Sequence, residues 1–446
     1  MTNNLMAGVS TVDITPPKGV ELAGYPHFPR YNTGVHDPLS ATCLYINDGE
    51  SSIAIVGLDS IFLSKKHVSA VRAKVEPETG IKSANIMFCC SHSHSSPWAA
   101  GRLDMESMLA GIRQDESYTG ELRDKLAGVV ISASRTAFPC QIGFATEICG
   151  QEQGIGGNRR DPVNGPCDPN VYVLSVKDEE GVVRALLVSY AVHPTLLHED
   201  NTLCSADYPG YLRACLREKF PHAVTVFCLG ASGDQSPRYF RNGQTFNEAK
   251  RFGYTIGGAA IRAVDKTLYS KHMSIKSGST VFNPKLRELP LKSEAERHVQ
   301  EKRVIYDRLI AERAPYIDIQ NANVALLGAE DILGYIIMRE KGLPIELVED
   351  EIPAEVSVLR IGDIYIAGLP GEVFIGISLL FRERSGLEKL IVSTVTNGCT
   401  PGYCYTREDG ILGGYEVDTS MLDTQAGYGM VDALLSVLDD VKPGNA

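Results

Sequence analysis

The sequence predicts an α/β fold in which a mixed, partly parallel central sheet is flanked by helices. Two observations support this fold class. Over about the first 280 residues, short runs rich in apolar and β-branched residues alternate with helix-like segments, which is the rhythm of βαβ units. Polar clusters follow several of the apolar runs, as expected where strands end at the functional edge of a sheet.

Two βαβ units can be placed in the first half of the chain. Each consists of an apolar strand, a helix and a second apolar strand. In chain order, the predicted segments are residues 51–60 (strand), 64–75 (helix) and 83–92 (strand), followed by 183–194 (strand), 208–220 (helix) and 223–232 (strand). Because such crossovers join parallel strands, the units predict that part of the sheet is parallel.

The βαβ rhythm stops near residue 290. Residues 292–313 form a charged helical segment, which we interpret as a solvated surface helix, either in an exposed insertion or at the junction of two lobes. Residues 354–372 predict a β-hairpin that leads into a helix, and residues 388–405 predict a strand that ends in an aromatic, Gly-rich loop.

We expect one catalytic domain over residues 1–446. It would consist of a main α/β lobe, residues 1–285, and a second lobe, residues 286–446. The second lobe would contribute two candidate site residues, Glu372 and Tyr403.

The composition is that of an ordinary soluble protein, with 43% hydrophobic and 22% charged residues. A formal net charge of −12 argues against nucleic-acid binding, because an acidic surface repels a phosphate backbone. The chain start has no signal-peptide pattern, and no run reaches the roughly 20 apolar residues of a membrane span. The eleven cysteines include no CxxC pair. We therefore expect a cytoplasmic protein with reduced cysteines and without stable membrane insertion; a homo-oligomer is compatible with the sequence.

The segment CSHSHSSPW, residues 90–98, places two histidines directly after a buried strand. In an extended strand, alternate side chains point to the same face, so His92 and His94 would present their imidazoles side by side. This pattern is typical of a metal site or a catalytic pair, but it also occurs without a function.

Four further residues stand at strand ends: His193, Asp234, Ser236 and Glu372. Each alone is explained by a turn, a cap or packing. Together, imidazole and carboxylate groups form the set of nitrogen and oxygen ligands that zinc prefers in hydrolytic centres. The chain lacks HExxH, the GxSxG nucleophile elbow and a Walker A motif, so other catalytic templates fit less well.

The ordered set of motifs resembles the catalytic region of the neutral/alkaline, non-lysosomal ceramidase family over nearly the whole chain. The segments that carry the resemblance are GVSTVDITPP, GVHDPLSATCLYI, CSHSHSSP, NRRDPVNGPCDPNVYVL, AVHPTLLHEDNTLCSADYPGY, GDQSP, LPGE and GYCYTREDGILGGYEV. Such an ordered set is more specific than any single motif.

The resemblance implies one zinc ion per chain, bound by two histidines, a glutamate and a tyrosine. Matched motif by motif, these ligands are His92, His193, Glu372 and Tyr403. Tyr405 is a rival for the tyrosine position, because the segment GYCY offers two tyrosines.

The resemblance also implies the residues that act on the substrate. His94 would be a general acid and base, and Arg159 and Tyr415 would lie near the scissile carbonyl. The serine of the GDQSP motif, Ser236, is either a nucleophile or a positioning residue, and we favour positioning. Asp234 would orient a ligand or Ser236.

The implied activity is hydrolysis of a linear amide by metal-activated water, with a small-molecule amide as substrate. This sequence departs from the family where glycines are replaced by Ser96, Trp98 and Ala99, and we interpret Trp98 either as the wall of a narrower pocket or as ordinary packing. We also expect neither a secretion signal nor the family's C-terminal β-sandwich, so the substrate need not be ceramide. The alternatives are an esterase or lactonase that uses the same zinc centre, a non-catalytic binding protein, and a serine hydrolase centred on Ser236.

Overall fold

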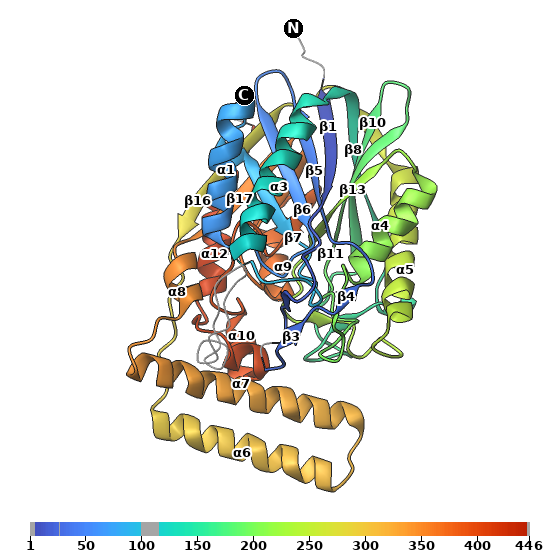
Figure 1. Cartoon of the computed structure of the whole chain (residues 1–446). Coiled ribbons are helices and arrows are strands. Elements are labelled where there is room, and N and C mark those ends of the chain that lie inside the picture. The colour runs from blue at the N-terminus through green and yellow to red at the C-terminus, as the bar shows by residue number, and fades with distance from the viewer. Residues whose placement is uncertain (1–4, 26, 100–115, 444–446) are drawn as a thin grey trace.

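Two β-sheets packed face to face form the centre of the fold, and helices cover both outer faces (Figure 1). The computed structural model describes residues 5–25, 27–99 and 116–443. The predicted α/β class, with a mixed and partly parallel sheet flanked by helices, is confirmed. The second sheet is a feature that the sequence did not predict.

The larger sheet has nine strands and is mostly antiparallel. Only β6 with β7 and β11 with β13 pair in parallel, and these are the two predicted βαβ units. In spatial order the strands are β13 (Val224–Leu229), β11 (Val183–Tyr190), β10 (Asn170–Asp178), β8 (Phe138–Ile148), β1 (Met6–Asp13), β5 (Ser40–Asn47), β6 (Ser52–Leu58) and β7 (Ile86–Cys90), with β15 (Leu268–Ser270) beside β8.

The smaller sheet has four strands and covers one face of the larger sheet. In spatial order they are β16 (Ile275–Phe282), β17 (Ala354–Ile361), β18 (Ile364–Gly368) and β19 (Leu390–Ser393). Side chains such as Ile55 and Val226 of the first sheet pack against Leu359 and Ile366 of the second in one apolar cluster. Strand β16 ends at Phe282, so the second sheet begins before the lobe boundary expected at residue 285. The division into two lobes stays a prediction.

Helices close the two outer faces. The larger sheet is covered by α1 (Lys65–Thr79), α3 (Glu116–Arg135), α4 (Tyr208–Lys219) and α5 (Phe246–Lys266). The smaller sheet is covered by α9 (Ile375–Ser385) and α12 (Ala426–Val441). The short elements are η1 (Ser83–Asn85), η2 (Gln151–Gln153), α8 (Glu346–Glu351), α10 (Arg407–Leu412), α11 (Tyr415–Asp418), and the strand pairs β2 (Glu21–Leu22) with β3 (Arg30–Tyr31), β4 (Gly34–Val35) with β12 (Leu203–Cys204), and β9 (Gly157–Asn158) with β14 (Gln235–Ser236).

The larger sheet curls until its two ends meet. A Cβ atom on Gly57 of β6 would lie 2.7 Å from the carbonyl oxygen of Phe227 in β13, so only glycine permits this approach. The loop after β19 joins the same region, because Thr394 donates its backbone N–H to Leu229 of β13 and Asn397 donates to Phe88 of β7. The carboxyl ends of β7, β13 and β19 are thereby held together.

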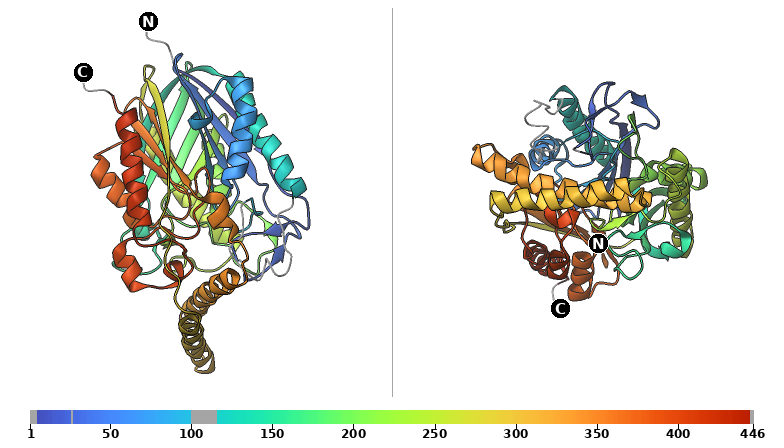
Figure 2. Two further views of the ribbon diagram at one scale, coloured as in Figure 1. Left: turned by 90° about the vertical axis from the view of Figure 1, so that its left-hand side faces the viewer. Right: turned by 90° about the horizontal axis from the view of Figure 1, so that it is seen from below.

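Helices α6 (Lys292–Ala311) and α7 (Tyr316–Glu340) form a hairpin that stands off the end of the sheets where these strands exit (Figures 1 and 2). In α6 the one fully buried side chain among the described residues is Ala295, in agreement with the predicted solvated surface helix. Helix α7 is more buried and faces the strand ends. Every helix in the described part of the chain is too short or too polar to cross a membrane.

Candidate metal centre and active site

His92 and His94 lie in the loop that follows β7. The expectation that they share a face of an extended strand is wrong, because β7 ends at Cys90 and His92 has a left-handed backbone with φ of 63°. The loop nevertheless brings the rings together, with their Nε2 atoms 3.4 Å apart. The left-handed backbone at His92, and not the alternation of side chains along a strand, places the two imidazoles side by side.

His193 and Glu372 approach the pair from two other strand ends. His193 follows β11, and Glu372 follows β18 in the turn that leads to α9. The Oε1 atom of Glu372 lies 3.0 Å from Nε2 of His193 and 3.1 Å from Nε2 of His92. Histidines that lie 179 and 280 positions before Glu372 in the chain therefore converge on its carboxylate.

Hydrogen bonds to main-chain carbonyls fix the orientation of the two imidazoles that face Glu372. Nδ1 of His92 donates to the carbonyl oxygen of Ile61 at 2.9 Å, and Nδ1 of His193 donates to that of Ser232 at 2.6 Å. Because a carbonyl oxygen only accepts, Nδ1 carries the proton and the neutral ring has a lone pair on Nε2. This is the outer support that metal-binding histidines commonly have.

The centre is therefore a cluster of electron-pair donors. Mainly because it is buried, His193 has a pKa lowered to about 4, so its ring is neutral at neutral pH. Burial alone would raise the pKa of Glu372, but that pKa lies well below its usual range, so the side chain is a carboxylate at neutral pH. Two lone pairs and a carboxylate that face one another at about 3 Å fit a shared cation.

His94 completes the group. The ring nitrogens of His92, His94 and His193 lie within 4.8 Å of one another and could hold a metal ion. Burial and the two neighbouring imidazoles lower the pKa of His94 well below 6.5. Its Nδ1 is buried and has no hydrogen-bond partner among the described residues.

The two tyrosines that competed for the ligand position are placed differently. Tyr403 lines the cavities beside the histidines, and the guanidinium carbon of Arg159 lies 5.6 Å from the centre of its ring. Burial, and then the charge of Glu372, raises the pKa of Tyr403 well above 10. Tyr405 turns away and donates its hydroxyl to the carbonyl oxygen of Leu422. Of the two tyrosines, Tyr403 therefore faces the cavities beside the histidines, and Tyr405 does not line either of them.

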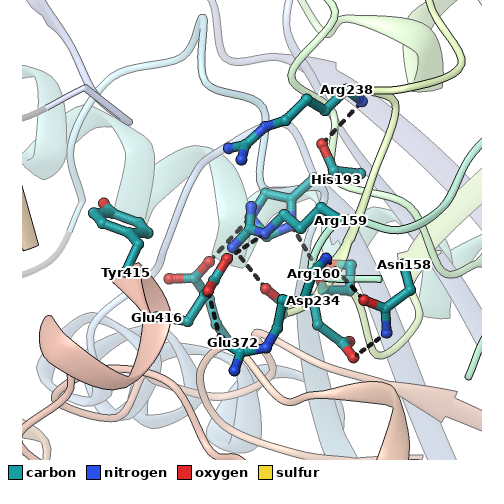
Figure 3. Close-up of polar contacts among 12 residues, drawn as sticks. Asn158, Arg159, Arg160, His193, Asp234, Arg238, Glu372, Tyr415 and Glu416 are labelled. Atoms are coloured by element: carbon teal, nitrogen blue, oxygen red, sulfur yellow. Dashed lines mark hydrogen bonds and ion pairs between the residues drawn. The ribbon is translucent and has the colours of Figure 1, made fainter. Parts of the chain in front are cut away.

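Arg159 is held in place by a buried carboxylate that the sequence did not single out (Figure 3). Its Nε lies 2.6 Å from Oε1 of Glu416, and it also donates to the carbonyl oxygen of Gly233. Arg160 contacts the other carboxylate oxygen of Glu416 at 3.0 Å. Burial lowers the pKa of Arg159, but Glu416 and Tyr403 outweigh it, so the net shift is upward. The only signal for Glu416 in the sequence was its position next to Tyr415.

Asp234 and Ser236 follow β13, Asp234 in the connecting turn and Ser236 in β14. Asp234 accepts hydrogen bonds from the backbone N–H of Ile375, at the start of α9, and from the side chain of Asn158. It thus fastens the segment that carries Glu372 to the segment that carries Arg159. Among the described contacts, the Ser236 hydroxyl accepts the backbone N–H of Arg238, and it has no imidazole partner.

Two cavities meet at the centre, with volumes of about 780 and 770 Å³ that are partly open to solvent. Both are lined by Gly24, His94, Tyr403 and Tyr415, so the predicted Tyr415 lies at their junction. The first cavity, here called the cationic cavity, is also lined by His27, Arg159, His193, His198, Glu199, Ser236, Arg238 and Arg241. The second, here called the apolar cavity, is also lined by Ile61, Phe62, His92, Trp98, Asp331, Tyr335 and Glu372.

Comparison with known proteins identifies the fold. No protein-family profile matches the chain, and no curated protein matches it in sequence. The crystal structure of neutral ceramidase from Pseudomonas aeruginosa matches it with a TM-score of 0.75 at 17% identity, over 100% of this chain and 76% of that one. A ceramidase complexed with C2 matches with a TM-score of 0.73 at 16% identity, over 100% of this chain and 77% of that one. The chain therefore has the neutral ceramidase fold, as its sequence motifs predicted.

Proposed function

We propose that the protein is a zinc-dependent hydrolase that cleaves a linear amide bond with water as the nucleophile. The observation that carries this proposal is the convergence of the Nε2 atoms of His92 and His193 on Oε1 of Glu372 at 3.1 and 3.0 Å. The substrate is a soluble or amphiphilic small molecule and need not be ceramide. The shared fold with ceramidases supports amide hydrolysis but does not by itself assign this activity.

His92, His193, Glu372 and Tyr403 would hold the metal ion, and two imidazoles with two oxygen ligands suit zinc. The fit rests on the Nε2 lone pairs that the hydrogen bonds to Ile61 and Ser232 leave free. When bound, zinc polarises a substrate carbonyl and lowers the pKa of water to about 7. Of the three histidines, His94 is left out of this ligand set because no carbonyl among the described residues supports its Nδ1.

Arg159 and Tyr415 would stabilise the negative charge that develops on the carbonyl oxygen. The ion pair with Glu416 and the bond to Gly233 restrict Arg159 to one orientation, so little reorganisation is needed during the reaction. Burial raises the pKa of Tyr415 above its usual range, so its hydroxyl keeps the proton that it donates. One such donor is worth about 2.7–4 kcal/mol of the activation barrier.

His94 would carry the proton from water to the leaving amine. Its lowered pKa keeps the imidazole neutral, so it can accept a proton as the water attacks. It then donates that proton to the nitrogen, because an amide anion is too basic to leave unprotonated. Ser236 would position the substrate, since its hydroxyl accepts a backbone N–H and bonds to no base among the described residues.

A hydrolysis screen with matched N-acyl amides and esters tests this function. The wild type should release amine from one or more amides, lose that activity with a chelator and recover it with added zinc. The His94→Ala variant should lose more amide cleavage than ester cleavage, because an alkoxide leaves more easily than an amide anion. Release of amine that chelators do not affect would contradict the proposal.

A further inference from the structure

Two arginines in the wall of the cationic cavity lack a carboxylate partner among the described residues. Arg238 donates to the side-chain oxygen of Asn321 at 3.3 Å, and Arg241 donates to the carbonyl oxygen of Thr195 at 2.8 Å. A guanidinium has five N–H donors, so most donors of both groups stay available. Figure 3 shows Glu416 against Arg159, with the guanidinium of Arg238 apart from it.

Both guanidinium groups belong to half-buried side chains in the wall of this cavity. Burial, and then the charge of Arg159, lowers the pKa of Arg238, and burial does the same for Arg241. Several other partly buried arginines of this chain do have carboxylate partners, such as Arg72 with Glu355 and Arg213 with Asp59. In a chain of net charge −12, two guanidinium groups that face one cavity without a carboxylate partner among the described residues point to an anion from outside the chain.

The two cavities differ in charge. Among the described lining residues, the apolar cavity has two carboxylates, Glu372 and Asp331, and no lysine or arginine. The cationic cavity has three arginines, and its one carboxylate, Glu199, contacts His198. Arg159 is paired with Glu416, whereas Arg238 and Arg241 have no carboxylate partner among the described residues, so these two are the groups that an anion would meet.

We propose that the substrate is an amphiphilic amide with a carboxylate at one end, which Arg238 and Arg241 bind, and an apolar group at the other end, which the apolar cavity binds. This inference rests on the proposed hydrolase function, because it places the scissile amide between the two ends. The cavities share His94, Tyr403 and Tyr415, so a linear molecule that occupies both must pass the candidate metal centre. Planar guanidinium groups match a carboxylate with paired hydrogen bonds.

Hydrolysis of matched amide pairs tests the proposal. The probes are N-octanoylglycine, N-octanoyl-β-alanine and the mono-octylamide of succinic acid, each compared with the same molecule in which the carboxylate is a primary carboxamide. They vary the distance between the amide and the carboxylate and the side of the amide that carries it. For at least one pair, kcat/KM of the wild type should be about tenfold or more higher for the acid, the factor that a charge-assisted hydrogen bond supplies.

Arg238→Gln and Arg241→Gln should each reduce this acid-to-carboxamide ratio, and Arg238→Lys should keep more of it because it retains the charge. Arg262→Gln, on the outer face of α5, is the matched control and should leave the ratio unchanged. Thermal unfolding identifies a variant that fails to fold. A wild-type ratio near one in all three pairs would overturn the proposal, as would variants that slow both members equally.

Binding separates this proposal from the proposed function. If no probe is hydrolysed, calorimetric titration of wild type with each acid and its carboxamide still decides the question. Tighter binding of an acid, lost in Arg238→Gln, would support the carboxylate site while the amide-hydrolase assignment fails. Equal binding of both members, or binding of neither, would overturn it.

Discussion

Gly24 lies directly against the imidazole of His94. A Cβ atom on Gly24 would lie 2.5 Å from Cγ and Nδ1 of His94 and 2.7 Å from its Cβ, and Gly24 also has a left-handed backbone with φ of +100°. Only glycine therefore leaves the ring where it is. The position of the proposed proton carrier depends on a residue about 70 positions away in the sequence.

Gly24→Ala should lower kcat/KM for amide substrates by about tenfold or more, because a displaced general acid loses most of its contribution. Gly19→Ala is the matched control: Gly19 has φ of +93°, but a Cβ there would contact nothing within 4 Å. Both variants carry a backbone cost of about 1–2 kcal/mol in the free energy of unfolding. Equal activity in the two variants would show that the position of His94 does not limit catalysis.

Tyr403→Phe and Tyr405→Phe should affect different properties. Loss of the Tyr403 hydroxyl removes a proposed metal ligand, so metal content and activity should fall at least about tenfold. Loss of the Tyr405 hydroxyl leaves the carbonyl of Leu422 without its donor, which costs about 1 kcal/mol of unfolding free energy. Metal analysis, kinetics and urea unfolding of both variants measure this. The reverse pattern would make Tyr405 the ligand.

Ser236→Ala should retain measurable amide hydrolysis, with a decrease of no more than about tenfold, because water is the proposed nucleophile. A serine nucleophile loses roughly 10⁶-fold in kcat when it is removed. The wild type should also resist labelling by fluorophosphonates. Labelling at Ser236, together with complete loss of activity in the variant, would instead support a serine hydrolase.

Asp234→Asn should change how stability depends on pH. Burial raises the pKa of Asp234 to about 6 in the folded protein, against 3.8 for the free side chain. The native state therefore binds this proton more tightly, and its contribution to stability is complete below pH 3.8 and lost as the pH rises through 6. Relative to the variant, the wild type should lose about 2 kcal/mol of unfolding free energy between pH 4 and 7. Parallel curves in urea unfolding would refute the raised pKa.

The predictable part of the fold was the part with local signals. The strands at 51–60 and 83–92 and the helix between them could be placed because each has its own hydrophobic pattern. The packing of the second sheet on the first was not predictable in this way. The sequence indicates that residues such as Ile364 and Ile366 of β18 are buried, but their hydrophobic pattern is the same whether a helix or a sheet covers them.

The candidate site was predicted through motifs and not through geometry. The motif resemblance selected His92, His193 and Glu372, which the structure brings together. The left-handed backbone of His92 has no sequence signal, since it is held by contacts of distant segments such as the bond from its Nδ1 to Ile61. Glu416 was missed because its role depends on Arg159, which is more than 250 positions away.

Metal content tests the central claim most directly. Wild-type protein purified without chelator, measured by plasma mass spectrometry, should contain about one zinc ion per chain. His92→Ala and Glu372→Ala should lose it, whereas His36→Ala, whose ring stacks on Phe246 on α5, should retain it. Wild type without metal, or metal retained in both site variants, would contradict the assignment of His92, His193 and Glu372 as a zinc centre.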